Sequence, residues 1–285
     1  TRILIMNIIQ RNCIRLLRKG AFNEHLTLEP MSAWKWERAL VFAQIHDITP
    51  WVFDGIRQSA DDFFLRLDAS LLANWQQATI HAVSEQAEAD IDKQETEEQR
   101  LSNPLLNRKL RRLLQQAEKE ISIESLQATK AFMLRLVGIS RNLLTQGIHL
   151  RRFVELAIYL RTTRDNIDYE HIRSWITQLY MEHVASLTAS VLVSLFDFDA
   201  GNIPFAEASS PKEAQQLIRE FMKISGNELD EWYFTQGDHV FVGTNNSSSL
   251  IWHVRHSFRY MYVFPQESPF NLLGNFIHSL SHIEE

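Results

Sequence analysis

The chain has 285 residues, of which only 9 are Gly and 7 are Pro; 45% are hydrophobic, and the net charge is -6. This shortage of turn formers argues against a β-sandwich or β-barrel, which needs Gly- and Pro-rich turns about every 8–12 residues. The apolar content and the low net charge argue against disorder. We therefore expect an all-α protein, a multi-helix bundle with ample apolar surface for a core.

Helix start and stop signals mark the first part of the chain. The first helix is expected to stop at Gly20, because glycine is the usual residue after a helix end. Ser32 is expected to cap the second helix through its hydroxyl. Thr49 is expected to cap the third, with Pro50 at the first helical position.

The next stretch, 61–101, has helical spacing with a break expected near Asp68. One face of this helix is predicted from the spacing of Leu72, Trp75, Thr79 and Val83. Its later part, 85–98, is rich in Glu, Gln and Asp and nearly lacks large apolar residues. Such a composition predicts an exposed face.

Helices also dominate the second part of the chain. They are expected over 105–119, 122–146, 150–164, 169–180, 182–196, 211–224, 249–264 and 269–283. The helix at 182–196 is apolar on three sides and should be the central buried one. A small β-hairpin is expected at 233–242, where two apolar triplets flank Gly237-Asp238. We expect two helical parts, 1–101 and 102–285, with one continuous domain as the alternative.

Chemistry-bearing motifs are scarce. Asp90 and Asp92 form a D-x-D pair, which could share a divalent metal, but they fall in a helical stretch without a phosphate-cradling Gly-rich turn. Two histidine pairs at helical spacing, 253/256 and 278/282, lack the glutamate of a zinc-protease motif. The single cysteine, Cys13, is expected to pack rather than react. We therefore predict no catalytic residue, no metal site and no cofactor.

Two flanking helical parts carry short motifs: the segment Gly147–Phe153, the helix at 156–160 and Ile167-Asp168-Tyr169, together with an Ala-x-x-His step at Ala43 and His46 before a proline. In these motifs the chain resembles a family of uncharacterised bacterial nucleotidyltransferases. The resemblance covers about half of the chain. Family members often occur among polysaccharide-synthesis genes, so the resemblance implies that setting.

This chain departs from the family pattern where the catalytic core should lie. Between Trp75 and Gly147 there is neither a Lys-Gly step nor a Gly-Asp-x-Asp strand, and Ala89-Asp90-Ile91-Asp92 echoes the carboxylate pair without β pattern or glycine. No catalytic residue is carried over. The resemblance implies the helical part of such a protein without its transferase.

The leading hypothesis is a non-catalytic bacterial protein that works through macromolecular contacts, with a protein partner or by self-association. Arg108, Arg111 and Arg112 are the candidate charged contacts, and Trp232 with Tyr233 is the candidate aromatic anchor. The pI of about 6.0 disfavours nucleic acid as the partner. The sequence contains no run of about 18 apolar residues, so we expect no membrane span. A single cysteine needs no oxidising compartment, so we expect a cytoplasmic location.

Two alternatives stay open. A divergent nucleotidyltransferase-like enzyme would use Asp90 and Asp92 with a divalent metal, so nucleotide binding is left open. A small-molecule binding protein would have a pocket between helices, lined by His149, Arg151 and Arg152.

Overall fold

The computed structural model describes residues 6–92, 100–145, 149–205 and 263–273, together with 215, 218, 219 and 222. All regular structure among these residues is helical, which confirms the predicted all-α class. The α-helices are α1 (Ile8–Phe22), α2 (Ala33–Ile45), α3 (Thr49–Arg57), α4 (Ala69–Asp92), α5 (Pro104–Glu120), α6 (Ile123–Thr145), α7 (Leu150–Thr163), α8 (Tyr169–Gln178) and α9 (Glu182–Phe196). The hairpin expected at 233–242 lies outside the described residues.

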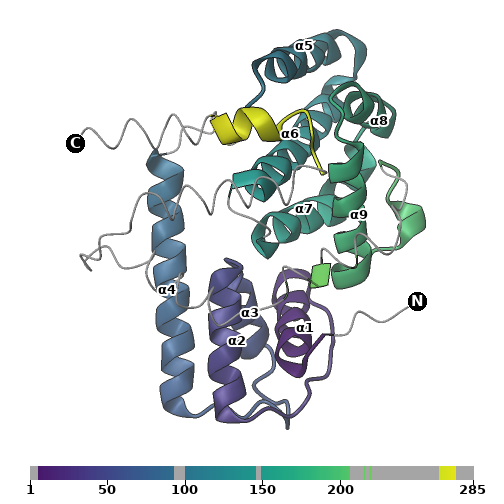
Figure 1. The fold of residues 1–285 in the computed structure, drawn as a ribbon. Coiled ribbons are helices and arrows are strands. Elements are labelled where there is room, and N and C mark those ends of the chain that lie inside the picture. Colours follow the sequence, from purple (N-terminus) through teal and green to yellow (C-terminus); the bar gives the residue numbers. More distant parts are fainter. Residues whose placement is uncertain are drawn as a thin grey trace, which may run out of the picture.

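The helices form two groups that share one core. Helices α1, α2, α3 and α4 lie together, and α5 to α9 form the second group (Figure 1). Buried apolar side chains connect the groups in a single cluster that extends from Cys13 in α1 to Phe264 near the C-terminal end. Helix α9 is buried along most of its length, as its apolar sequence predicts. None of the helices in the described part of the chain is long and apolar enough to span a membrane.

Helices α1 and α3 cross at close range through two glycines. A Cβ atom added to Gly20 would lie 1.9 Å from the carbonyl oxygen of Trp51, and one added to Gly55 would lie 2.0 Å from that of Leu16. Gly20 therefore lies inside α1, and the predicted stop at this residue is wrong. The helix continues to Phe22 and ends at Asn23, whose φ of 56° is left-handed.

Two predicted helix caps differ from those in the structure. Ser32 occupies the cap position of α2, but its hydroxyl makes no capping hydrogen bond. Helix α3 begins one residue earlier than expected, so Ile48 is the cap residue and Thr49 is already helical. Pro50 still lies in the first turn, where its missing N–H costs nothing. In contrast, Asp68 accepts a hydrogen bond from the Leu71 amide at 2.8 Å, which confirms the break before α4.

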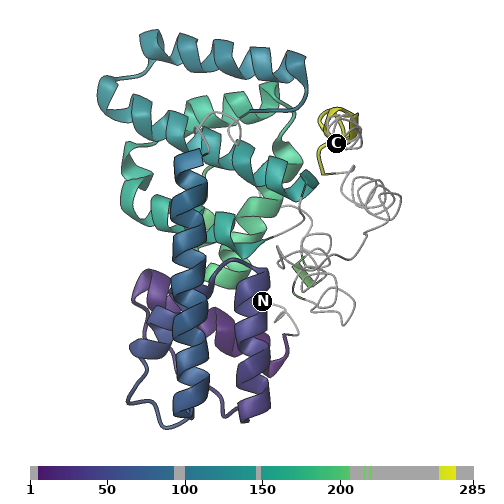
Figure 2. The same cartoon turned by 90° about the vertical axis from the view of Figure 1, so that its left-hand side faces the viewer.

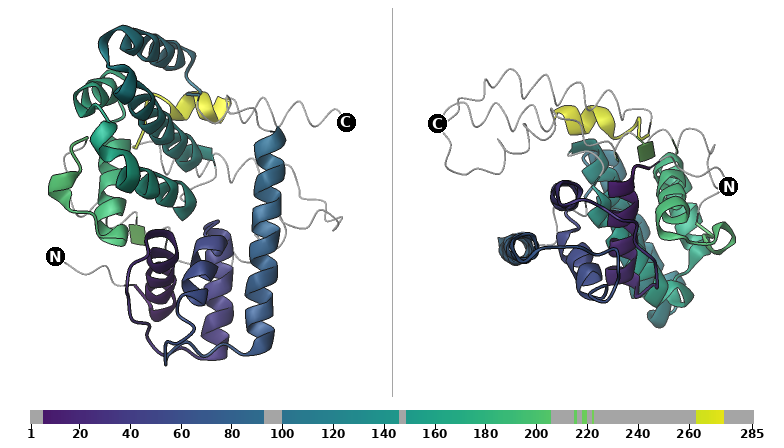
Figure 3. Two further views of the ribbon diagram at one scale, coloured as in Figure 1. Left: turned by 180° about the vertical axis from the view of Figure 1, so that it is seen from behind. Right: turned by 90° about the horizontal axis from the view of Figure 1, so that it is seen from below.

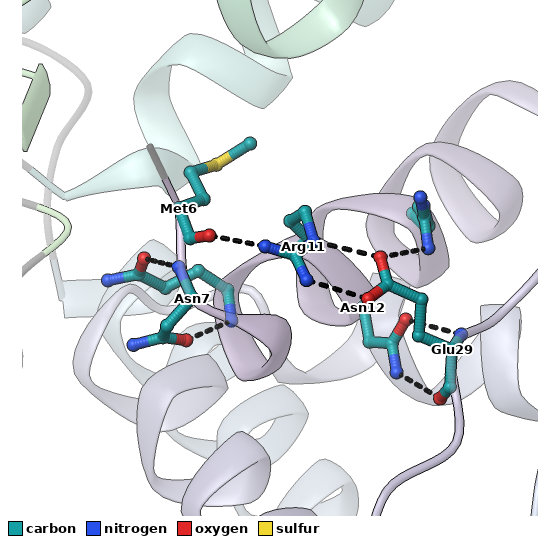
Figure 4. A network of polar contacts seen from close by, with 7 residues as sticks. Met6, Asn7, Arg11, Asn12 and Glu29 are labelled. Carbon is teal, nitrogen blue, oxygen red and sulfur yellow. Dashed lines mark hydrogen bonds and ion pairs between the residues drawn. The ribbon is translucent and has the colours of Figure 1, made fainter. Parts of the chain in front are cut away.

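The loop between α1 and α2 is held by Glu29 (Figure 4). Its carboxylate accepts hydrogen bonds from Arg11 Nε at 2.8 Å and Nη2 at 2.6 Å, and from Arg15 at 2.8 Å. The backbone of Glu29 exchanges two hydrogen bonds with the Asn12 side chain, at 2.8 and 3.0 Å. These arginine contacts lower the pKa of Glu29 to about 2, because they favour the charged carboxylate over the protonated one.

The described C-terminal segment, 263–273, packs onto the start of α5. Glu267 is 1% exposed, and its carboxylate accepts hydrogen bonds from the Ser102 amide and, at 3.0 Å, from the Asn103 amide. The Asn103 side chain donates to the carbonyl of Gln266 at 2.9 Å. Burial raises the pKa of Glu267, and these amide donors oppose the shift. The start of α5 is therefore fixed from outside its own helix.

Helix α4 stands at the margin of the molecule. Viewed from below, it lies beside the first helical group rather than within it (Figure 3). A second view shows it running past both groups (Figure 2). Among the α4 side chains that the structure describes, the buried ones are Leu71 and Trp75, both in its first two turns.

Candidate functional site

The outward side of α5 carries the arginines that the sequence singles out. Arg108, Arg111 and Arg112 are all exposed. They are three and four positions apart, so they are neighbours on the helix surface. The opposite side of the helix buries Leu106, Leu110, Leu113 and Ala117. Asn103 caps the helix through its side chain, with distances of 3.0 and 3.4 Å to the amides of residues 105 and 106.

These three guanidinium groups make no ion pair or hydrogen bond with any residue in the described part of the chain. Three of the other four charged groups of α5 have partners among the described residues. Lys109 donates to the carbonyl of Gln178 at 2.8 Å, Glu118 pairs with Lys130 at 2.7 Å, and Glu120 lies 3.3 Å from His171. Both carboxylates of this helix thus have basic partners, and its arginines are left to solvent.

The remaining residues considered for a partner surface or a metal are Trp232, Tyr233, Asp90 and Asp92. Trp232 and Tyr233 lie outside the described residues. Asp90 and Asp92 lie on the helical backbone of α4, where positions two apart diverge by about 200°. No set of three or more His, Cys, Asp or Glu among the described residues is placed to hold a metal ion.

A hollow of about 570 Å³ lies between α4 and the rest of the molecule. It is bordered by the end of α2, the start of α3, one side of α4 and the start of α7. The lining is mostly polar and consists of Leu40, Gln44, Asp47, Thr49, Pro50, Asn74, Gln77, Ala78, His81, Ala82, Glu85, Gln86 and Arg151. Its volume falls within the range of about 300–1,000 Å³ that is usual for small-molecule sites.

Asp47 is the charged residue at the turn between α2 and α3. Its φ of 53° is left-handed, a conformation that Asp and Asn adopt more readily than most residues. The surrounding protein raises the pKa of Asp47 by removing water, the nearby Glu85 charge adds to this shift, and His149 and Arg151 oppose it. The Nδ1 atom of His149 lies 3.8 Å from the carboxylate.

A backbone hydrogen bond connects the start of α7 to the end of α2 at the edge of the hollow. The Arg151 amide donates to the carbonyl of His46 at 3.2 Å. His46 itself is 3% exposed, and its ring lies 4.4 Å from that of Phe42. Burial lowers the pKa of His46 to about 3, and the neighbouring His149 adds to this shift. His46 is therefore a neutral packing residue at neutral pH.

The sequence-based pocket prediction names part of this hollow. Arg151 lines it, and His149 borders it beside Asp47. Arg152 instead shares Glu155 with Arg151, at distances of 3.0 and 2.9 Å. Sequence reasoning missed Asp47 and the polar side of α4. The left-handed backbone of Asp47 is seen only in the structure, so the sequence carried no signal for this residue.

Comparison with protein-family models, with curated proteins and with solved structures finds no match for this chain. The resemblance to the nucleotidyltransferase family therefore stays a prediction. Two segments that carry it do meet in the fold, because His46 and Arg151 are joined by the hydrogen bond described above. That contact places both segments at the edge of the hollow.

Proposed function

We propose that this chain is a non-catalytic helical protein that works by binding an acidic surface of a protein partner through α5. The observation that supports the proposal is the set of three exposed arginines, Arg108, Arg111 and Arg112, without an ion-pair partner among the described residues. They lie on a chain whose net charge is -6, so this face differs in sign from the molecule as a whole.

Arginine suits such a surface for physical reasons. Its planar guanidinium offers five N–H donors and matches a carboxylate with two parallel hydrogen bonds. Such groups are enriched among the residues that dominate binding energy at protein interfaces. Leu105, which is 75% exposed three positions before Arg108, adds apolar area to the same end of the helix.

An acidic protein fits this face better than a nucleic acid. Nucleic-acid binding draws on several phosphate contacts, each supplied by a basic group, and usually on a basic excess over the whole domain. Here the basic face is local and the pI is about 6.0. The buried single cysteine needs no oxidising compartment, so we place this function in the cytoplasm.

Fluorescence anisotropy with a labelled Glu/Asp-rich peptide tests the proposal. At about 150 mM salt, we expect the triple variant Arg108→Gln, Arg111→Gln, Arg112→Gln to bind at least about tenfold more weakly than the unmodified chain. A matched variant that removes Arg38, Arg57 and Arg66, on the first helical group, should bind as the unmodified chain does.

Three outcomes would contradict the proposal. One is the absence of peptide binding by the unmodified chain, and a second is equal weakening in both triple variants. A third is tighter binding of a labelled oligonucleotide that depends on the same three arginines, which would identify a nucleic-acid partner instead. Sedimentation of the chain alone distinguishes self-association from binding to another protein. If the partner is a second copy, the unmodified chain sediments as a dimer and the α5 triple variant sediments as a monomer.

A further inference from the structure

Helix α4 faces the protein with its polar side. The residues that border the hollow, Asn74, Gln77, His81 and Glu85, follow at three- and four-residue steps along one side. The apolar residues Leu72, Ile80 and Val83 are 42%, 63% and 51% exposed. On a helical projection they lie about 170° from the hollow side. Of the face predicted from Leu72, Trp75, Thr79 and Val83, only Trp75 is fully buried, Thr79 is half-buried, and Leu72 and Val83 are exposed.

Hydrophobic burial alone would rotate α4 about its axis so that its apolar side faced the protein, since apolar side chains gain free energy by leaving water. The space beneath its upper turns is instead lined by amides, carboxylates and a histidine. The polar α4 residues named above are exposed, so water reaches their polar groups there. A ligand that replaces this water must offer hydrogen-bonding groups to the same side chains.

The basic groups around the hollow are largely engaged. Arg151 and Arg152 share Glu155, and His81 lies 3.1 Å from Glu85. The carboxylate of Asp47 accepts no hydrogen bond from the described residues, and His149 Nδ1 lies 3.8 Å from it. The Asp47 side chain is 57% exposed, so its carboxylate is open to a ligand.

A buried hydroxyl provides a second, independent observation. Thr49 is 1% exposed and lines the hollow beside Asp47. It makes no side-chain hydrogen bond with any described residue. Because Thr49 lines the hollow, its hydroxyl is reached from there, and water or a ligand can supply the bond that the protein does not.

We propose that the hollow binds a small aliphatic amine, with its ammonium group between Asp47 and Glu85. An ammonium ion has three donors and no acceptor, which suits two carboxylates, the Thr49 hydroxyl and the oxygen of the Gln44 amide. The amides of Asn74 and Gln77 are placed to bond polar groups further along the ligand. An anion would meet repulsion from both carboxylates.

Calorimetric titration with three compounds that share a four-carbon chain tests the charge preference. The probes are the diamine putrescine, the neutral butanediol and the dianion succinate. We expect the full chain to bind putrescine at least about tenfold more tightly than butanediol, and to bind succinate least. Preferred binding of succinate, or no heat with putrescine at millimolar concentration, would overturn the proposal.

Two variants locate the binding. Asp47→Asn keeps a residue that tolerates the left-handed backbone, and Glu85→Gln changes a side chain that is 54% exposed, so both should fold. Each should weaken putrescine binding at least about tenfold. Asp165→Asn is the matched control, since this side chain is 91% exposed at the end of α7 and away from the hollow. Loss of binding in all three variants, or in none, would contradict the assignment.

Discussion

The contact between α1 and α3 and the seat of α4 represent two opposite ways of packing a helix. At Gly20 and Gly55 the backbones of α1 and α3 approach so closely that no side chain fits between them. Helix α4 is anchored at its first turns by Trp75, and above that point it is separated from the protein by a polar hollow. Glycines allow α1 and α3 to pack in direct contact, whereas polar side chains border the space between α4 and the rest of the protein.

This difference separates a structural region from a candidate binding region. Close backbone packing leaves no room for a ligand and makes the position of each atom critical. A polar hollow beside a helix held at one end leaves both space and freedom to adjust. The α1–α3 contact should therefore be sensitive to small changes, and the upper part of α4 should tolerate them.

The largest effect is expected at the α1–α3 crossing. Gly20→Ala places a Cβ atom 1.9 Å from a backbone oxygen, so the two helices must separate. We expect a loss of about 3 kcal/mol in the free energy of unfolding, measured by urea denaturation. Ile80→Ala on the exposed side of α4 is the comparison, with a change within about 0.5 kcal/mol. Equal losses in both variants would break the contrast between the two regions.

A smaller effect is expected at Glu29, which ties the α1–α2 loop to α1. Its folded pKa of about 2 lies below the ordinary value of 4.5, so its contribution to stability is fully present above 4.5 and is lost as the pH falls towards 2. Glu29→Gln should therefore lower stability by about 1 kcal/mol at neutral pH, after allowance for solvent screening.

Urea denaturation over a pH series checks this expectation. The difference between the unmodified chain and Glu29→Gln should shrink steadily below about pH 4.5. A difference that stays constant down to the acid end would show that the arginine contacts of Glu29 add no stability. The variant would then report only the loss of packing.

The sequence predicts the helices well where their ends carry local signals. Asp168 caps α8 through bonds of 3.1 Å to the amides of residues 170 and 171, and Asn103 caps α5 with Pro104 in its first turn. These signals act within one turn of the chain, so they can be read without knowledge of the fold. Gly20 shows the limit. Glycine serves both as a helix stop and as a close-contact residue, and only the partner helix decides between them.

The candidate sites divide in the same way. The exposed arginines of α5 follow from the apolar stripe of that helix, because the stripe fixes which side faces solvent. The hollow depends on Asp47, Thr49, α4 and Arg151, which are far apart in sequence. Helix α4 moreover faces inward with its polar side, against the pattern that amphipathicity predicts. Long-range packing alone could place these residues together.

Amide hydrogen exchange along α4, with and without putrescine, tests most directly the claim that its upper turns border an open polar site. We expect the amides above Trp75 to exchange at least about tenfold faster than those of α1, and putrescine to slow them. Equal protection in α1 and α4, with no change on adding the amine, would contradict both the contrast between the two regions and the binding site.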